Sequence, residues 1–274
     1  MNSANVASIG VVVINLDTRA DRWTCFEREV SPFFTEVPVV RLSAIHGESL
    51  PGYGLRPWFR GRKRDRTWAG RAGCVLSHRG ALELGLAKGW RYTLILEDDV
   101  QVVADVKKLI PKIIQSLAQV RWGVCYLGYT NPTGPAHTMV GVSDSFSMLQ
   151  VYGCSATHAY LVNRSQIKCL LNNLPTEQDV WLWLSRHRAI DAWYSRHLSK
   201  ISPVLALSQS IFIQRQSVSD ITGQAYETPH LINIPDNLCV KSGFSWRFKW
   251  SGVKAYLGSL YDRLKGFSKK FRGF

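Results

Sequence analysis

The chain has 274 residues, of which 46% are hydrophobic and 20% are charged, so it can form a substantial core and is not a disordered polymer. Its net charge of +14 predicts attraction to a polyanion such as nucleic acid, anionic lipid or a phosphorylated substrate. No apolar run reaches the roughly 20 residues of a membrane span, and the six cysteines show no CxxC spacing, which predicts reduced thiols rather than a disulfide framework.

Strand and helix patterns alternate from the start of the chain. The apolar run "IGVVVINL" predicts a buried strand over residues 9–16, and Asp17 or Thr18 is expected to cap the helix that follows. A second strand is expected over 37–42, then a long irregular segment over 43–71 that contains the basic stretch "RPWFRGRKRDR", then a helix over 74–88.

The same alternation continues beyond residue 90. Strands are predicted at "RYTLIL", "WGVCYLG", "SATHAYLV" and "PVLALSQ", and helices over 102–119, 164–173 and 176–200. Strands that alternate with helices predict an α/β fold with a mixed, mostly parallel sheet and helices on both faces. We assign this domain to residues 1–235 and treat 236–274 as a separate tail.

The tail carries one apolar stripe at helical spacing. Its members recur every three or four residues and are Trp250, Val253, Leu257, Leu260, Leu264, Phe267 and Phe271. Nine Lys and Arg accompany the single acid Asp262 between residues 241 and 274, so a basic amphipathic helix that lies on an anionic membrane surface is predicted. The alternative is a terminal helix that packs on the domain with a solvated basic back.

Three acids follow the predicted strand at "LILEDDV". In open α/β sheets, ligands bind beyond the carboxyl ends of the strands, which is where Glu97, Asp98 and Asp99 stand. In extended geometry Glu97 and Asp99 point to one face, where two carboxylates suit Mg²⁺ or Mn²⁺. The alternative is that Asp98 or Asp99 caps a helix that begins near Val102.

Five motifs, in this order, resemble glycosyltransferase family 25, the bacterial lipopolysaccharide and lipooligosaccharide sugar transferases that are related to collagen galactosyltransferase domains. They are "VVINLDTRADRW", "RAGCVLSHRGALE", "LILEDDV", "THAYLVNR" and "AIDAWYSRHL", and with "QSVSDI" they extend over about residues 9–221. Arg71 departs from the pattern, because the family usually has an acid before the "GC" element. The resemblance implies a GT-A-like fold and inverting transfer of a hexose, most often galactose, from a UDP-sugar to a lipopolysaccharide-type glycan.

The resemblance also implies a set of site residues. Glu97 and Asp99 would match the acidic metal motif for Mn²⁺ or Mg²⁺, with Asp99 as the direct ligand, Glu97 on the ribose or a metal-bound water, and Asp98 orienting the turn. Residues expected to bind the donor are Asn15, Asp17, Arg19, Arg22, Ser77, His78, Glu97, Asp98 and Asp220.

An inverting transfer needs a base for the acceptor hydroxyl. Asp191 in "AIDAWYSRHL" matches the family's recurring Asp and is expected, with Asp99, to be catalytic. The alternatives are that Asp191 is only a helix N-cap, or that Asp179 or Asp220 is the base instead.

Three functions remain open from the sequence. The first is the transferase, with a UDP-sugar donor, a glycolipid or oligosaccharide acceptor, and a cytoplasmic location, peripheral on the cytoplasmic face of a bacterial inner membrane. The second is a basic protein that binds nucleic acid or another polyanion, although no helix-turn-helix, RNP or zinc-finger signature is present, so we expect no nucleic-acid partner. The third is an inactive transferase-like membrane scaffold, which the intact acidic residues argue against.

Overall fold

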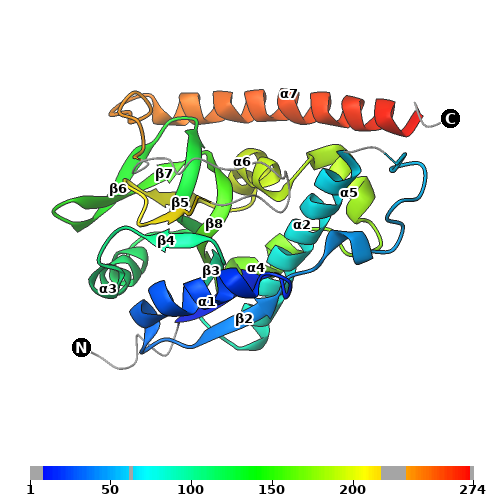
Figure 1. Ribbon diagram of the computed structural model, residues 1–274. Helices are drawn as coiled ribbons and strands as arrows, with labels where there is room; N and C mark the ends of the chain where they lie inside the picture. The colour runs from blue at the N-terminus through cyan, green and yellow to red at the C-terminus, as the bar shows by residue number, and fades with distance from the viewer. Residues whose placement is uncertain (1–8, 62–63, 217–232, 272–274) are drawn as a thin grey trace.

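The computed structural model describes residues 9–61, 64–216 and 233–271 (Figure 1). In this part of the chain eight strands form one sheet in the order β2-β1-β3-β8-β5-β9-β7-β6, and β10 pairs with β4 in a second, two-stranded sheet. The strands are β1 (Ile9–Asn15), β2 (Val39–Ser43), β3 (Tyr92–Glu97), β4 (Val100–Val102), β5 (Val124–Thr133), β6 (His137–Ser143), β7 (Phe146–Val151), β8 (Gly153–Asn163), β9 (Val204–Leu207) and β10 (Phe212–Gln214). The helices are α1 (Ala20–Glu29), α2 (Arg64–Ala87), α3 (Val106–Leu117), α4 (Arg164–Leu171), α5 (Val180–His187), α6 (Ile190–Ile201) and α7 (Phe244–Phe271), with short 3₁₀ turns η2 (Ser31–Phe34) and η3 (Gly47–Ser49).

The main sheet is mixed. β1 pairs in parallel with β2 and β3, and β5 pairs in parallel with β9, whereas β8 runs antiparallel to β3 and β5, and β7 runs antiparallel to β6 and β9. The predicted α/β class and the predicted strands are therefore confirmed. The β6–β7 hairpin was not predicted, because neither of its strands carries a long apolar run: β6 is mostly exposed.

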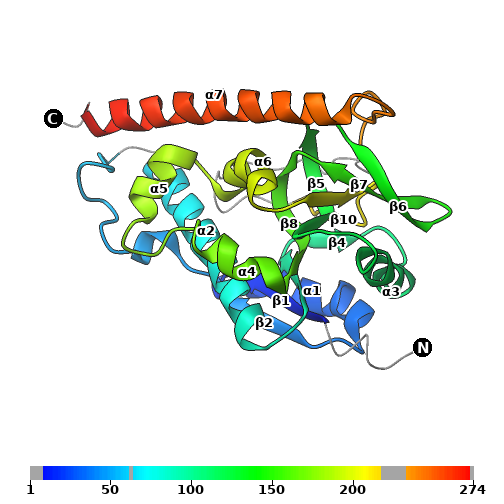
Figure 2. The same cartoon turned by 180° about the vertical axis from the view of Figure 1, so that it is seen from behind.

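Hydrophobic side chains form a core on each face of the sheet. On one face Val12 and Ile95 pack with side chains from α2, α4, α5 and α6. On the other face Val11 and Leu94 pack with side chains from α1, η2 and α3. Successive strand residues point to opposite faces, so both faces of β1 and β3 need apolar residues, and the continuous apolar runs follow from that. Figures 1 and 2 show the two groups of helices from opposite sides.

Two helices differ from their predicted bounds. α2 begins at Arg64, ten residues before the predicted start, and Ala69 and Ala72 are buried on its inner face. The first turns of α2 are rich in arginine, so the helical spacing of the small buried residues Ala69 and Ala72 was not recognised in the sequence. The single helix predicted over 176–200 is two helices, because Arg188 at φ 72° lies between α5 and α6, outside the right-handed helical region.

The predicted cap of α1 is wrong. Arg19 is the N-cap residue and makes no side-chain cap bond. Asp17 instead accepts hydrogen bonds from Ser43 and from Arg41, the latter at 2.7 Å, so it joins the loop after β1 to the end of β2. The Asp17 carboxylate could have capped the helix, but it bonds to Arg41 and Ser43 of β2 instead. Local residue spacing gives no sign of these partners, because they lie on another strand.

The acid triplet does not cap α3. The helix begins at Val106, and its N-cap Asp105 accepts a hydrogen bond from the backbone N–H of Lys108 at 3.2 Å. The strand β4 lies between the acids and this helix. The capping explanation for Asp98 and Asp99 is therefore excluded.

Candidate functional site

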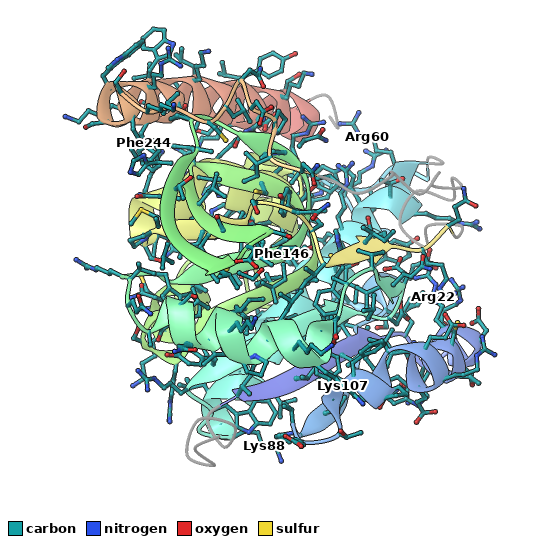
Figure 3. All side chains as sticks on the ribbon, turned by 90° about the vertical axis from the view of Figure 1, so that its left-hand side faces the viewer. Arg22, Arg60, Lys88, Lys107, Phe146 and Phe244 are labelled. Atoms are coloured by element: carbon teal, nitrogen blue, oxygen red, sulfur yellow. The ribbon has the colours of Figure 1, made fainter. Side chains whose placement is uncertain are left out.

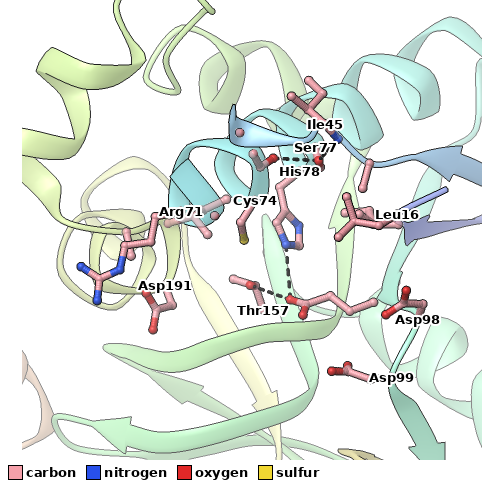
Figure 4. A pocket seen from close by; sticks show the side chains of 18 of the residues that line it. Leu16, Ile45, Arg71, Cys74, Ser77, His78, Asp98, Asp99, Thr157 and Asp191 are labelled. Carbon is pink, nitrogen blue, oxygen red and sulfur yellow. Dashed lines mark hydrogen bonds and ion pairs between the residues drawn. The ribbon is translucent and has the colours of Figure 1, made fainter. Parts of the chain in front are cut away.

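A cavity of about 740 Å³ lies beyond the carboxyl ends of β1 and β3 (Figure 4). This volume lies in the usual range for small-molecule sites. Its walls come from the end of β1 and the loop after it, from α1, from the loop after β2, from α2, from the acid turn after β3, from β5 and β8, from the start of α6, and from the end of β10. Polar and charged side chains on these walls include Thr18, Arg22, Glu48, Arg66, Arg71, Ser77, His78, Glu97, Asp98, Asp99, Thr157, Asp191, Gln214 and Arg215.

Arg22 supplies a cation to the acid turn. Its Nη1 lies 3.1 Å from Asp98 Oδ1 and 3.4 Å from Asp99 Oδ2. The second oxygen of Asp98 accepts a hydrogen bond of 2.6 Å from Asn15 Nδ2, at the end of β1. Burial raises the pKa of Asp98, and the contacts with Asn15 and Arg22 oppose that rise. The Asp98 side chain thus ties the turn between β3 and β4 to the end of β1 and to α1.

Asp99 is the acid with unused binding capacity. Burial, followed by the negative charge of Glu97, raises its pKa to about 7. Its Oδ1 atom is buried and has no hydrogen-bond partner within the described residues. A buried carboxylate oxygen without a donor is costly, which is typical of a group that binds something in the working protein.

Glu97 is held on the opposite side of the turn. Thr157 Oγ1 donates to its Oε1 at 3.0 Å, and His78 Nε2 lies 3.4 Å from the same oxygen. The other ring nitrogen of His78 is 2.9 Å from the hydroxyl of Tyr160. Burial alone would raise the pKa of Glu97, but the contacts with His78 and Thr157, together with the electrostatic influence of His158, hold it below its ordinary value. In Figure 4, dashed lines mark the contacts of His78 and Thr157 with the Glu97 carboxylate.

Two wall residues have strained backbones. Asn131 has a φ of 43° and Ala156 a φ of 68°, in the left-handed region that glycine favours. Both lie where the β5–β8 register shifts, and both line the cavity. Backbone strain of this kind concentrates at functional sites. No local pattern in the sequence marks these two residues, because the strain depends on pairing between strands that are far apart in the chain.

Asp191 lies at the other end of the cavity. Figure 4 places Asp191 and Arg71 on one side and Asp98 and Asp99 on the other. The N-cap residue of α6 is Ala189, and Asp191 Oδ1 accepts a hydrogen bond from the adjacent backbone N–H of Ala192 at 2.7 Å. The N-cap alternative for Asp191 is therefore wrong, and its carboxylate faces the cavity.

The two competitors of Asp191 stand elsewhere. Asp179 accepts hydrogen bonds from the backbone N–H and the hydroxyl of Thr176, at 2.7 and 2.8 Å, and does not line the cavity. Asp220 lies outside the described residues.

The structure gathers most of the predicted site residues at this cavity. Those on its wall are Arg22, Ser77, His78, Glu97, Asp98, Asp99 and Asp191. Asn15 supports the wall from behind through Asp98. Asp17 and Arg19 do not line the cavity, since Asp17 contacts β2 and Arg19 pairs with Asp21. Thr157, Gln214 and Arg215 were not predicted, although Thr157 lies in the motif "THAYLVNR" and the other two are the polar end of the run "FIQR".

The acid turn offers few ligands for the predicted metal. Across residues 9–61, 64–216 and 233–271, no group of three or more His, Cys, Asp or Glu side chains is arranged to hold an ion. Asp99 nevertheless offers a buried, unpartnered oxygen, and Mg²⁺ or Mn²⁺ commonly takes one or two protein carboxylates and completes its shell with water and substrate phosphates. Glu97 is less available, because one oxygen already accepts from Thr157. The residues present fit an ion held mainly by Asp99.

Much of the sequence that forms this cavity is similar to known proteins. Residues 9–128 match the model of glycosyltransferase family 25, described as an LPS biosynthesis protein. The chain is 30% identical over 131 residues to procollagen galactosyltransferase 2 of Homo sapiens and, equally, of Mus musculus. Each match covers 43% of this chain and 20% of the relative, so the chain matches about a fifth of the length of these proteins.

Solved structures show distant similarity. The protein A197 from STIV aligns with a TM-score of 0.38 and 12% identity, covering 83% of this chain and 97% of that one. A glycosyltransferase involved in the glycosylation of the major capsid of PBCV-1 aligns with a TM-score of 0.38 and 8% identity, covering 89% and 98%. The sequence match is the informative one: residues 9–128, which carry Arg22, His78 and the acid turn, have the pattern of glycosyltransferase family 25, as the motifs predicted.

Proposed function

We propose that this protein is an inverting glycosyltransferase that uses a nucleotide-sugar donor. The observation that carries the proposal is a single cavity with the acid turn at one end and Asp191 at the other, built largely from the segment that matches glycosyltransferase family 25. Donor and acceptor must both be present in such a reaction, and a cavity with two chemically distinct ends accommodates both.

The acceptor end supplies the base. Asp191 takes the proton from the acceptor hydroxyl while that oxygen bonds to the anomeric carbon. The bond from the anomeric carbon to the diphosphate oxygen breaks in the same step, and the nucleotide diphosphate leaves with the electron pair. Attack opposite the leaving group inverts the configuration of the sugar.

The donor end must tolerate the negative charge of the departing diphosphate. Arg22 lies against Asp98 and Asp99, and Arg215 lies on the same wall, with its backbone N–H bonded to the carbonyl of Asp99 at 2.7 Å. A divalent ion on Asp99, Mn²⁺ or Mg²⁺, would supply Lewis-acid stabilisation of the leaving group there. Glu97, held by Thr157 and His78, would accept a hydrogen bond from the donor ribose.

The substrates follow from the family context. We infer a UDP-hexose donor, with galactose as the first choice because the matched relatives are galactosyltransferases. The acceptor we infer is a lipopolysaccharide or lipooligosaccharide glycan, in line with the description of the matching family. Arg66 and Arg71 on the wall of the cavity suit an acceptor that carries phosphate or carboxylate groups.

A donor screen tests the proposed function. Purified full-length protein with Mn²⁺ or Mg²⁺ and a lipooligosaccharide acceptor is expected to release nucleotide from one UDP-hexose at least about tenfold faster than from other nucleotide sugars. Product linkage analysis by NMR should show an inverted anomeric centre. Nucleotide release that is absent with every donor and acceptor, or a retained anomeric configuration, would contradict the proposal.

The variant Asp191→Asn tests whether Asp191 acts as the general base rather than in donor binding. Removal of a general base typically costs about 10²- to 10⁴-fold in rate, so kcat should fall by that amount while the donor KM changes little. Asp179→Asn is the matched control, since Asp179 lies outside the cavity wall and should retain nearly full activity. If Asp179→Asn loses activity and Asp191→Asn does not, Asp191 is not the base.

A further inference from the structure

The helix α7 packs on the domain through its small and polar face. Ala255, Ser259 and Asp262 are buried in this contact, and α7 lies against α5 and α6. Asp262 bonds to Arg196 of α6 and lies 3.7 Å from Arg188. A Cβ at Gly266 would come within 1.9 Å of the backbone oxygen of Ser185, so this glycine allows the close approach of α7 to α5.

Six of the large apolar side chains of α7 point the other way, whereas Phe244 and Phe248 pack against His137 and Tyr152 of the domain. The six are between 44% and 68% exposed and are Trp246, Trp250, Val253, Leu257, Leu264 and Phe267. At 3.6 residues per turn, Leu257 and Leu264 lie roughly opposite Asp262 and Ser259 around the helix axis. The sequence-based alternatives set a membrane-bound helix against a helix that packs on the domain with a solvated basic back. The helix does pack on the domain, but the side that it leaves in solvent carries the apolar stripe as well as basic side chains.

Basic side chains border the exposed apolar stripe on both sides. Arg247, Lys254 and Lys265 fall on one edge, roughly 80–100° from the centre of the stripe, and Lys249 and Arg263 fall on the other. All five are exposed. Tyr256 and Tyr261 are also exposed, and the acid nearest to them, Asp262, is buried against Arg196.

We propose that this outer face of α7 binds the surface of a bilayer that contains anionic lipids. An amphipathic helix with a large apolar stripe and Lys or Arg on its polar edges lies in the interface plane, with the stripe at the acyl boundary and the cations among the headgroups. Within the described ranges no helix combines the length and apolar character needed to cross a membrane. The amphipathic pattern of α7 favours lateral binding, along the roughly 42 Å that a 28-residue helix spans.

A second copy of the chain fits this surface less well. Two α7 helices that bury their stripes against each other would bring the basic edges of both helices together, and like charges repel. An anionic surface instead complements both edges at once. The proposal stands on the geometry of α7 and does not depend on the transfer reaction.

Vesicle co-sedimentation of the full-length protein tests the proposal. Wild-type protein should sediment with phosphatidylcholine vesicles that contain 30% phosphatidylglycerol and bind at least about tenfold more weakly to phosphatidylcholine alone. The triple variant Trp250→Ser, Leu257→Ser, Leu264→Ser should lose at least about 100-fold in partition coefficient, because the apolar area that enters the bilayer is removed. The substituted side chains are exposed, so folding is unaffected.

A charge-matched pair of variants locates the binding face. Lys249, Lys254 and Lys265 changed together to Gln should weaken binding at least about tenfold and flatten its salt dependence. Lys88, Lys107 and Lys112 changed to Gln remove the same charge from exposed positions, and Figure 3 shows Lys88 and Lys107 at the end of the molecule away from α7. This control should bind like wild type.

Three results would overturn the proposal. The first is equal losses in the two charge variants, which would make binding a matter of net charge alone. The second is wild-type-like sedimentation of the apolar triple variant. The third is a wild-type dimer in light scattering that the apolar triple variant converts to a monomer without any vesicle binding, which would make a second copy the occupant.

Discussion

Asp99→Asn is expected to lower the transfer rate by about 10³-fold while leaving the fold intact, because it removes the carboxylate best placed to bind the ion that neutralises the leaving diphosphate. The amide is nearly isosteric with the carboxyl group. Burial and the charge of Glu97 raise the pKa of Asp99 to about 7, so the ionised form is held at a cost that a neutral amide avoids. The variant should therefore be at least as stable as the wild type.

Metal binding provides a readout that is independent of turnover. Isothermal titration of the wild type with Mn²⁺ in the presence of UDP should show one site, and Asp99→Asn should weaken it by at least about tenfold. Asp105→Asn is a suitable control, since Asp105 is a nearby carboxylate that follows β4 and caps α3 away from the cavity. Undiminished turnover and unchanged Mn²⁺ affinity in Asp99→Asn would remove Asp99 from the metal site.

Gly73→Ala is expected to destabilise the protein by about 3 kcal/mol, through overpacking that forces the backbone to move. A Cβ at Gly73 would lie 2.2 Å from the backbone oxygen of Ile45, and a Cβ at Gly47 would lie 1.7 Å from the backbone oxygen of Ala69. These two glycines let α2 cross the loop after β2 at backbone contact distance. Urea denaturation should show the loss as a lower midpoint with an unchanged slope.

The close contact between α2 and the loop after β2 also holds polar side chains of the site in position. Ser77 donates to the carbonyl of Gly73 at 2.7 Å and accepts from the backbone N–H of Ile45 at 2.8 Å. Gly73→Ala should therefore also reduce activity, since His78 follows Ser77 directly. The control is Gly80→Ala on the same helix, where a Cβ would meet only Leu42 at 3.6 Å. That variant should be neutral or more stable by up to about 1 kcal/mol, and equal losses in both variants would contradict the explanation.

The motifs predicted the position of the acid turn, because each motif is a pattern within one short stretch of the sequence. β1 and β3 are continuous apolar runs that must be buried on both faces, and the acids that follow β3 then stand at the carboxyl edge of the sheet. Helix bounds were less predictable: the first turns of α2 and the break at Arg188 depend on packing with other segments.

Long-range contacts determined what each acid does. The sequence showed three adjacent charges, and the fold assigned Asp98 to Arg22 and Asn15, left one oxygen of Asp99 without a donor, and tied Glu97 to His78 and Thr157. Those partners lie 19 to 83 positions away in the sequence, where no local pattern can find them.

The amino-acid sequence by itself determined the α/β class, the strand that ends in the acid turn, and the amphipathic character of the tail, because all three follow from hydrophobic periodicity within short windows. Only the tertiary structure decided that α7 leaves its apolar stripe in solvent. The same apolar stripe could face the domain or the solvent. Two contacts with residues far away in the sequence favour the outward orientation: the ion pair of Asp262 with Arg196, and the close approach of Gly266 to Ser185. A buried ion pair and a backbone close approach are properties of two segments together, so they exist only once the chain has folded.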